Sequence, residues 1–137
     1  MILETAWLLP CYGLLGAGLT LPWSLRLVRQ TGPRPAAYLN ILMTLLALVH
    51  SCWLLTSIWG EPAYQLEFSW FQAFDLNLVC SFAISPISAG ASVMIATMSL
   101  ISQVYGLGSL ETDWALARFC ALIGFFEAAI TGIAFSD

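Results

Sequence analysis

The stretch FCALIGFFEAAITGIAF, residues Phe119–Phe135, decides the fold, because it is long and apolar and contains a single charged side chain. That side chain is Glu127, which lies near the middle of the stretch. A carboxylate at mid-depth in a membrane costs roughly 3 kcal/mol or more unless it faces protein or water. Glu127 is therefore predicted to mark a functional site.

The whole chain has the composition of an integral membrane protein. Of its 137 residues 60% are hydrophobic and 9% are charged, whereas a soluble domain has about a quarter charged residues. Residues 5–25, 35–60 and 76–110 are free of charge, and a membrane-crossing helix needs about 20 such residues. The predicted fold is an all-α membrane protein, a single segment with four transmembrane helices at residues 5–27, 36–59, 82–107 and 114–135.

Charge and cysteine usage exclude several function classes. The net charge of -4 offers no basic surface for nucleic acid. The four cysteines, Cys11, Cys52, Cys80 and Cys120, form no C-x-x-C pair and are interpreted as buried small hydrophobes. The sequence shows no P-loop, metal-ligand set, iron–sulfur spacing or nucleophilic triad. We therefore expect no catalytic residue, metal site or cofactor in this chain.

The distribution of arginines predicts the orientation in the membrane. Arg26, Arg29 and Arg34 are three of the four basic residues and lie between the first two predicted helices, so this loop is placed on the cytoplasmic side. The amino terminus is then lumenal. Between residues 64 and 79 apolar and polar side chains alternate, which predicts a β-hairpin on the lumenal side, between the second and third helices.

The helical spacing of small and polar residues predicts where Glu127 points. Cys120, Gly124 and Thr131 share its face, so Glu127 is expected to face the bundle rather than lipid. A buried carboxyl favours the neutral acid, which still needs a hydrogen-bond partner. The candidates are Thr131, the serines along one face of the third helix, and His50.

Two further groups of polar residues have more than one interpretation. His50 lies near mid-depth in the second helix, where it could relay protons or simply be hydrogen-bonded in the packing. Glu111 and Asp113 lie in the third loop, which shares the cytoplasmic side with Arg34. These charges form either a solvated loop or a docking surface for a soluble partner.

Several short segments carry a resemblance through their order and spacing: Ala6-Trp7-Leu8-Leu9-Pro10, Leu14-Leu15-Gly16-Ala17, Phe74-Asp75-Leu76, Ile84-Ser85-Pro86-Ile87-Ser88, Arg118-Phe119 with Leu122 and Phe126, and Ser136-Asp137. Together they resemble the antiporter-like chain 5 of the respiratory complex I group in its cyanobacterial and plastid NAD(P)H-quinone oxidoreductase form. Family members usually have Asp at Ser85 and an apolar residue at Glu127. They are also several times longer, so this chain is expected to be an amino-terminal piece.

The resemblance implies a subunit at the distal end of the membrane arm of a thylakoid complex. Electrons pass to plastoquinone in that complex and drive proton translocation, while the quinone site and iron–sulfur clusters belong to other subunits. The other membrane-arm subunits are then the expected partners. A specialised form of the complex serves CO2 uptake through a soluble carbonic-anhydrase-like partner on the cytoplasmic face, where Arg34, Glu111 and Asp113 are candidate contacts.

Two alternatives stay open. The chain could be a small four-helix proton-coupled transporter that uses Glu127 as its exchange site. It could also be a non-catalytic scaffold or assembly protein, with Glu127 only hydrogen-bonded in the packing.

Overall fold

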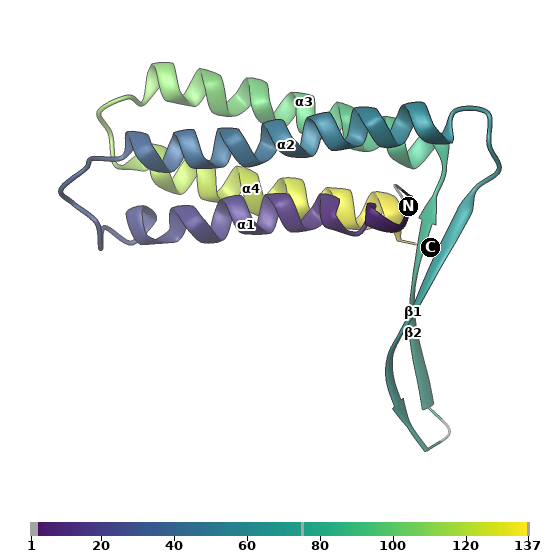
Figure 1. Cartoon of the computed structure of the whole chain (residues 1–137). Helices are drawn as coiled ribbons and strands as arrows, with labels where there is room; N and C mark the ends of the chain where they lie inside the picture. The colour runs from purple at the N-terminus through teal and green to yellow at the C-terminus, as the bar shows by residue number, and fades with distance from the viewer. Residues whose placement is uncertain (1–2, 75, 137) are drawn as a thin grey trace.

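Four α-helices pack together and run alternately in opposite directions (Figure 1). The computed structural model describes residues 3–74 and 76–136, without the side chains of Trp70, Gln72 and Ala73. Asp75 and Asp137, quoted above for the resemblance, therefore lie outside the described residues. The helices are α1 (Leu8–Ser24), α2 (Arg34–Ile58), α3 (Pro86–Ser109) and α4 (Ala115–Phe135), and a 3-10 turn, η1 (Leu3–Thr5), precedes α1.

The helices form a bundle in which α1 and α3 each pack against both α2 and α4. α2 and α4 also touch each other across the centre. The connections between α1 and α2 and between α3 and α4 lie at one end of the bundle, and both termini lie at the other (Figure 1). We call these the loop end and the terminal end.

Three of these helices, α2, α3 and α4, are long and apolar enough to cross a membrane. α1 has 17 residues, which is short of the about 20 that a membrane crossing requires. Large apolar side chains such as Leu46, Met98 and Phe126 are exposed on the outside of the bundle. The predicted multi-pass membrane protein is confirmed, and a crossing by the first helix stays a prediction.

Glycine allows α1 and α4 to approach each other closely. A Cβ atom added to Gly13 would lie 2.7 Å from the backbone oxygen of Gly124 and 2.9 Å from the backbone nitrogen of Ala128. A Cβ atom added to Gly124 would lie 3.0 Å from the backbone oxygen of Gly13. Backbone atoms cannot move aside as the tip of a side chain can, so this contact needs glycine on both helices.

The predicted hairpin forms and projects from the terminal end of the bundle (Figure 1). Its strands, β1 (Tyr64–Ala73) and β2 (Leu76–Ile84), are antiparallel. Ile84, at the base, is fully buried in a core cluster with Leu54 of α2 and Phe135 of α4. The hairpin is thus anchored at its base, and most of its described length is exposed.

A β-bulge keeps the apolar face of the hairpin continuous. Phe68 pairs with Cys80, and the register shifts between Ser69 and Phe71 so that Phe71 pairs with Leu78. Cys80 and Leu78 are two residues apart and point to the same face. The extra residue in β1 therefore places Phe71 on the same side as Phe68, although their spacing is odd.

β2 and α3 meet later in the chain than predicted. β2 extends to Ile84 and α3 spans residues 86–109, in place of a hairpin ending at 79 and a helix at 82–107. The reason is a capping box: the backbone N–H of Ser88 donates to the Ser85 hydroxyl at 3.1 Å, and that of Ser85 donates to the Ser88 hydroxyl at 2.9 Å. Pro86 in the first turn completes this helix start.

α1 is shorter than the predicted helix at residues 5–27. Arg26 adopts a φ of +58°, and the N–H groups of Arg26 and Leu27 donate to the carbonyls of Trp23 and Pro22 at 3.0 and 2.9 Å. This pattern is a Schellman motif, which ends the helix at Ser24. At its amino-terminal end α1 begins at Leu8 and not at the predicted residue 5, because residues 3–5 form a 3-10 turn. α2 and α4 differ from their predicted ranges by at most two residues at either end.

The close contact of α1 and α4 predicts a large effect of one added methyl group. Gly13→Ala and Gly124→Ala should each destabilise the protein by about 1–3 kcal/mol, because overpacking forces the backbones apart. Thermal unfolding in detergent micelles, followed by circular dichroism, measures the effect. Gly18→Ala and Gly132→Ala are matched controls on the same two helices, because an added Cβ there meets nothing within 4 Å. Equal unfolding temperatures for all four variants would contradict the prediction.

Candidate functional site

The interior of the bundle contains many polar side chains beside its apolar core clusters. Many of the buried hydroxyl groups donate to carbonyls of their own helix, as Thr20 does to Ala17 at 2.8 Å and Ser92 does to Ala89 at 2.7 Å. The hydrogen bonds between buried side chains of different helices gather around Glu127. Among the described residues, ten buried side chains are polar or charged: Thr20, Asn40, Thr44, Ser51, Ser88, Ser92, Ser99, Gln103, Glu127 and Thr131.

Glu127 is only 2% exposed and belongs to a group of polar side chains from three helices. The Thr44 hydroxyl on α2 donates to Glu127 Oε2 at 2.9 Å. Gln103 on α3 donates from Nε2 to the Thr44 hydroxyl oxygen at 2.8 Å. The Ser99 side chain, one turn from Gln103 on α3, also lies near the Glu127 carboxyl. We call Glu127, Thr44, Gln103 and Ser99 the carboxyl network.

Asn40 makes a second contact between α2 and α4, one turn from Thr44. Its Nδ2 donates to the backbone oxygen of Cys120. Its Oδ1 faces Gly16 on α1 and Gly124 on α4, where a Cβ added to either glycine would meet it. Among the described residues, Asn40 Oδ1 and Gln103 Oε1 are the buried side-chain atoms without a hydrogen-bond partner.

The structure agrees with part of the sequence interpretation of Glu127. The carboxyl faces the interior, as its helical spacing predicts, and one neighbour, Ser99, comes from the predicted serine face of the third helix. Thr44 and Gln103 were missed. A signal for Thr44 was present, because Asn40, Thr44 and Ser51 recur at helical spacing and predict a polar face on α2.

His50 is separate from the carboxyl network. Its Nε2 lies 3.0 Å from the Thr5 hydroxyl oxygen, and its ring meets the Tyr12 ring edge-on with centroids 5.8 Å apart. These contacts direct it toward the start of α1, where it lines a surface pocket with Leu8 and Trp53. The structure therefore does not bring the two proton-path candidates, Glu127 and His50, together.

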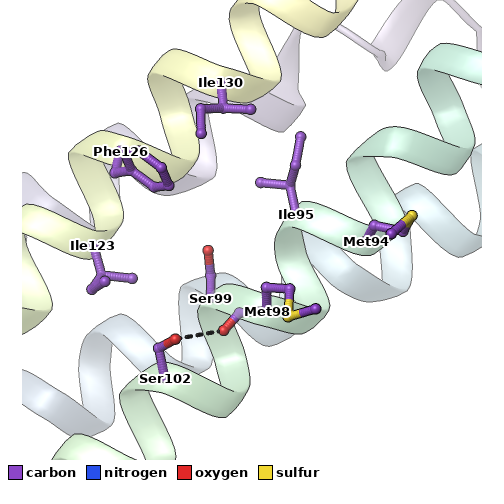
Figure 2. Close-up of a pocket in the computed structure, with 8 residues that line it drawn as sticks. All are labelled: Met94, Ile95, Met98, Ser99, Ser102, Ile123, Phe126 and Ile130. Carbon is purple, nitrogen blue, oxygen red and sulfur yellow. Dashed lines mark hydrogen bonds between the residues drawn. The ribbon is translucent and has the colours of Figure 1, made fainter.

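An apolar groove lies between α3 and α4, outside the carboxyl network (Figure 2). It has a volume of about 290 Å³, and Figure 2 shows the Ser99 hydroxyl directed from α3 toward α4. Because Ser99 both lines the groove and lies near the Glu127 carboxyl, it lies between the groove and the carboxyl. The lining residues are Met94, Ile95, Met98, Ser99, Ser102, Ile123, Phe126 and Ile130.

The loop end brings together the charged residues that were predicted to meet there. Arg34 and Glu111 form an ion pair and remain about half exposed, at 50% and 53% of the side chain. Asp113 is also exposed, and its Oδ1 accepts a hydrogen bond from the backbone N–H of Ala115 at 2.9 Å, at the start of α4. Arg34 and Glu111 thus connect the two loops, whereas Asp113 supports a helix start.

The carboxyl network has the chemistry of hydrogen-bond and proton exchange. It holds one carboxyl, two hydroxyls and one amide, all of them buried. In the described part of the chain, no group of three or more His, Cys, Asp or Glu side chains could hold a metal ion. Fold and site together define an α-helical membrane protein with a hydrogen-bonded acid in its interior.

The particular family follows from comparison with known proteins. Residues 70–120 match the family described as NADH-ubiquinone oxidoreductase (complex I), chain 5 N-terminus. Over 98% of its length the chain is 41% identical to NAD(P)H-quinone oxidoreductase subunit 5, organellar chromatophore 2, of Paulinella chromatophora, of which it covers 22%. The predicted family, the chain 5 subunits of the complex I group, is thereby confirmed, with this chain corresponding to their amino-terminal part.

More distant relatives carry similar names. The chloroplastic subunit 5 of Chlorokybus atmophyticus is 29% identical over 98% of this chain, which covers 21% of that relative. Chain 5 of a Picosynechococcus strain is 28% identical over 97% of this chain, which covers 20% of it. The chain thus spans about a fifth of the length of the curated relatives it matches.

Proposed function

We propose that this chain forms the amino-terminal membrane segment of a chain 5 subunit in a thylakoid NAD(P)H-quinone oxidoreductase complex. It contributes there to redox-driven proton translocation coupled to plastoquinone reduction. The supporting observation is 41% identity, over 98% of the chain, to a subunit of NAD(P)H-quinone oxidoreductase. Other membrane-arm subunits are its partners, and the quinone site and iron–sulfur clusters lie in other subunits.

All four helices cross the membrane in this proposal. α1 lies beside α2 and α4, and its 17 residues are at the lower limit of about 17–25 for a crossing helix. The loop between α1 and α2 carries the exposed Arg26 and Arg29, and Arg34 follows at the start of α2. By the positive-inside rule the loop end is cytoplasmic, which makes the amino terminus and the hairpin lumenal.

The hairpin is proposed to dock on a neighbouring membrane-arm subunit. Phe68, Phe71, Leu76 and Leu78 are all large apolar side chains that are exposed along one described face. An apolar face of this kind is costly in water, so burial against a partner is favourable. We assign this docking to another subunit and not to the helices of the same chain, because most of the hairpin projects away from those helices (Figure 1).

Membership in the complex predicts co-purification and a functional defect. A chain tagged in its host should purify with the other membrane-arm subunits. Disruption of its gene should abolish the plastoquinone reduction and proton uptake that depend on the complex. Native gel electrophoresis with peptide mass spectrometry, and proton uptake by thylakoid vesicles, measure the two effects. A tagged chain that purifies alone as a stable protein, with the complex intact in its absence, would refute the proposal and favour a small transporter.

The proposed orientation predicts which positions react from each side. Gln30→Cys and Thr112→Cys, both exposed at the loop end, should be labelled by a membrane-impermeant maleimide from the cytoplasmic side. Glu61→Cys, exposed between α2 and β1, should be labelled only from the lumenal side. The native cysteines are replaced by alanine or serine in this background. Labelling of Glu61→Cys from the same side as Gln30→Cys is the outcome that the proposed topology forbids.

A second candidate is the form of the complex that serves CO2 uptake. The observation that favours it is the exposed Arg34–Glu111 ion pair at the loop end. A pair of this kind leaves polar groups of both charges accessible to a soluble carbonic-anhydrase-like partner on the cytoplasmic side. Asp113 lies beside the pair in sequence but is engaged at the start of α4.

The CO2-uptake candidate predicts a defect without loss of assembly. An exposed ion pair contributes only about 0–1 kcal/mol to stability, so Arg34→Gln and Glu111→Gln should leave the complex assembled. Each variant should nevertheless lower uptake of inorganic carbon by living cells. Arg29→Gln is the control, because Arg29 is exposed in the same loop and forms no ion pair in the described part of the chain. Normal uptake in both Arg34 and Glu111 variants would remove this candidate.

A further inference from the structure

Glu127 carries an ionisable group where the packing alone requires only a hydrogen-bond acceptor. The bond from Thr44 to Oε2 would form equally well to the side-chain oxygen of a glutamine. A carboxyl that ionises in a membrane interior costs more than an amide, which stays neutral. An acid at this position is explained by the one ability that an amide lacks, which is to bind and release a proton.

The surroundings leave Glu127 as the isolated acid of the interior. Among the described residues, no titratable or charged side chain hydrogen-bonds with it. The titratable groups on the four helices make other contacts or face outward. Cys11 bonds to the backbone of α1, His50 contacts Thr5 and Tyr12, Cys120 is buried two turns away on α4, and Arg34, Tyr38, Cys52, Tyr105 and Arg118 are exposed.

We propose that Glu127 binds and releases a proton during the working cycle, and that Thr44 and Gln103 form a hydrogen-bond chain that reverses direction with each exchange. When Glu127 is ionised, Gln103 donates to Thr44 and Thr44 donates to the carboxylate, at 2.8 and 2.9 Å. When Glu127 is protonated, its O–H donates to Thr44 and the Thr44 hydroxyl donates to Gln103 Oε1. The proton comes from hydronium and returns to water, and no other covalent bond changes.

The unpartnered oxygen of Gln103 is what makes the reversal possible. Gln103 is fully buried, and its Oε1 has no hydrogen-bond partner among the described residues. A half-turn of the amide exchanges its nitrogen and oxygen, which occupy nearly equal volumes, so the surrounding side chains need not move. Both states contain two bonds along the chain and leave one amide atom of Gln103 without a partner. The network therefore accommodates the ionised and the protonated acid with the same number of bonds.

Ser99 provides the contact between this exchange site and the edge of the bundle. It lies near the Glu127 carboxyl and lines the groove between α3 and α4. The remaining groove residues are apolar except for Ser102, whose hydroxyl donates to the backbone oxygen of Met98 at 2.9 Å (Figure 2). Ser99 is thus the polar groove residue that joins the carboxyl network.

The test is infrared difference spectroscopy between low and high pH, on the purified membrane assembly that contains the tagged full-length chain. A carbonyl band of a protonated acid should change with pH and be absent in Glu127→Gln, which keeps the acceptor for Thr44. Thr44→Val should shift the frequency of the band and change the proton affinity by about tenfold, because its bond to the ionised acid is charge-assisted. Thr44→Ser, which keeps the hydroxyl, should preserve both properties.

Two outcomes overturn the inference. A Glu127-dependent acid band that stays constant over the pH range would show a permanently protonated, structural acid. No Glu127-dependent acid band at any pH would show a permanently ionised one. The inference deepens the proposed function by naming a proton-exchanging group, but the two can fail separately. If the tagged chain purifies without other membrane-arm subunits, the proposed function fails, and the spectra of the chain in that preparation still decide the role of Glu127.

Discussion

The hydrogen bond from Thr44 to Glu127 joins the two helices that face each other across the centre of the bundle. Gln103 on α3 donates a hydrogen bond to the same Thr44 hydroxyl. Asn40, one turn from Thr44 on α2, donates to the backbone oxygen of Cys120 on α4. A hydrogen bond between membrane helices contributes only about 0.6–2 kcal/mol. Its larger effect is on specificity, because any rotation of α2 or α4 that breaks the bond leaves a buried carboxyl without its donor.

The hydrogen bonds between α2 and α4 also depend on the small size of Gly124. A Cβ atom added to Gly124 would lie 3.1 Å from Asn40 Oδ1 and 3.0 Å from the backbone oxygen of Gly13. One residue therefore leaves space both for the Asn40 amide and for the contact between α1 and α4. A side chain at this position would separate α4 from both neighbours and would also lengthen the bond to Glu127, one turn further along the helix.

The sequence alone predicts the elements and the faces better than the contacts between them. Charge-free runs locate the helices, alternation locates the hairpin, and the spacing around Glu127 orients the carboxyl inward. Thr44 and Gln103 are not predicted as its partners, because the relative rotation of two helices is set by the packing of the whole bundle. The proposal of His50 as a partner shows the same limitation. His50 is adjacent to the buried Ser51, but successive residues of a helix are rotated by about 100°, which turns His50 toward the start of α1.

Different forces act on the bundle and on the hairpin. Lipid tails are as apolar as leucine, so contacts between large side chains give little advantage to one helix arrangement over another in a membrane. Small residues and polar bonds specify the centre of the bundle, and many of the large apolar residues lie on the outer surface, although Leu54 and Phe135 are buried near the terminal end. The hairpin leaves the terminal end of the bundle and extends sideways, across the direction of the helices (Figure 1). Burial of an apolar face is favourable wherever that face would otherwise meet water. The bulge that keeps Phe71 on the same face as Phe68 preserves that face, which the chain itself leaves exposed. The bundle thus pairs most of its buried polar groups internally, with Asn40 Oδ1 and Gln103 Oε1 as the exceptions among the described residues, whereas the described chain leaves the apolar face of the hairpin uncovered.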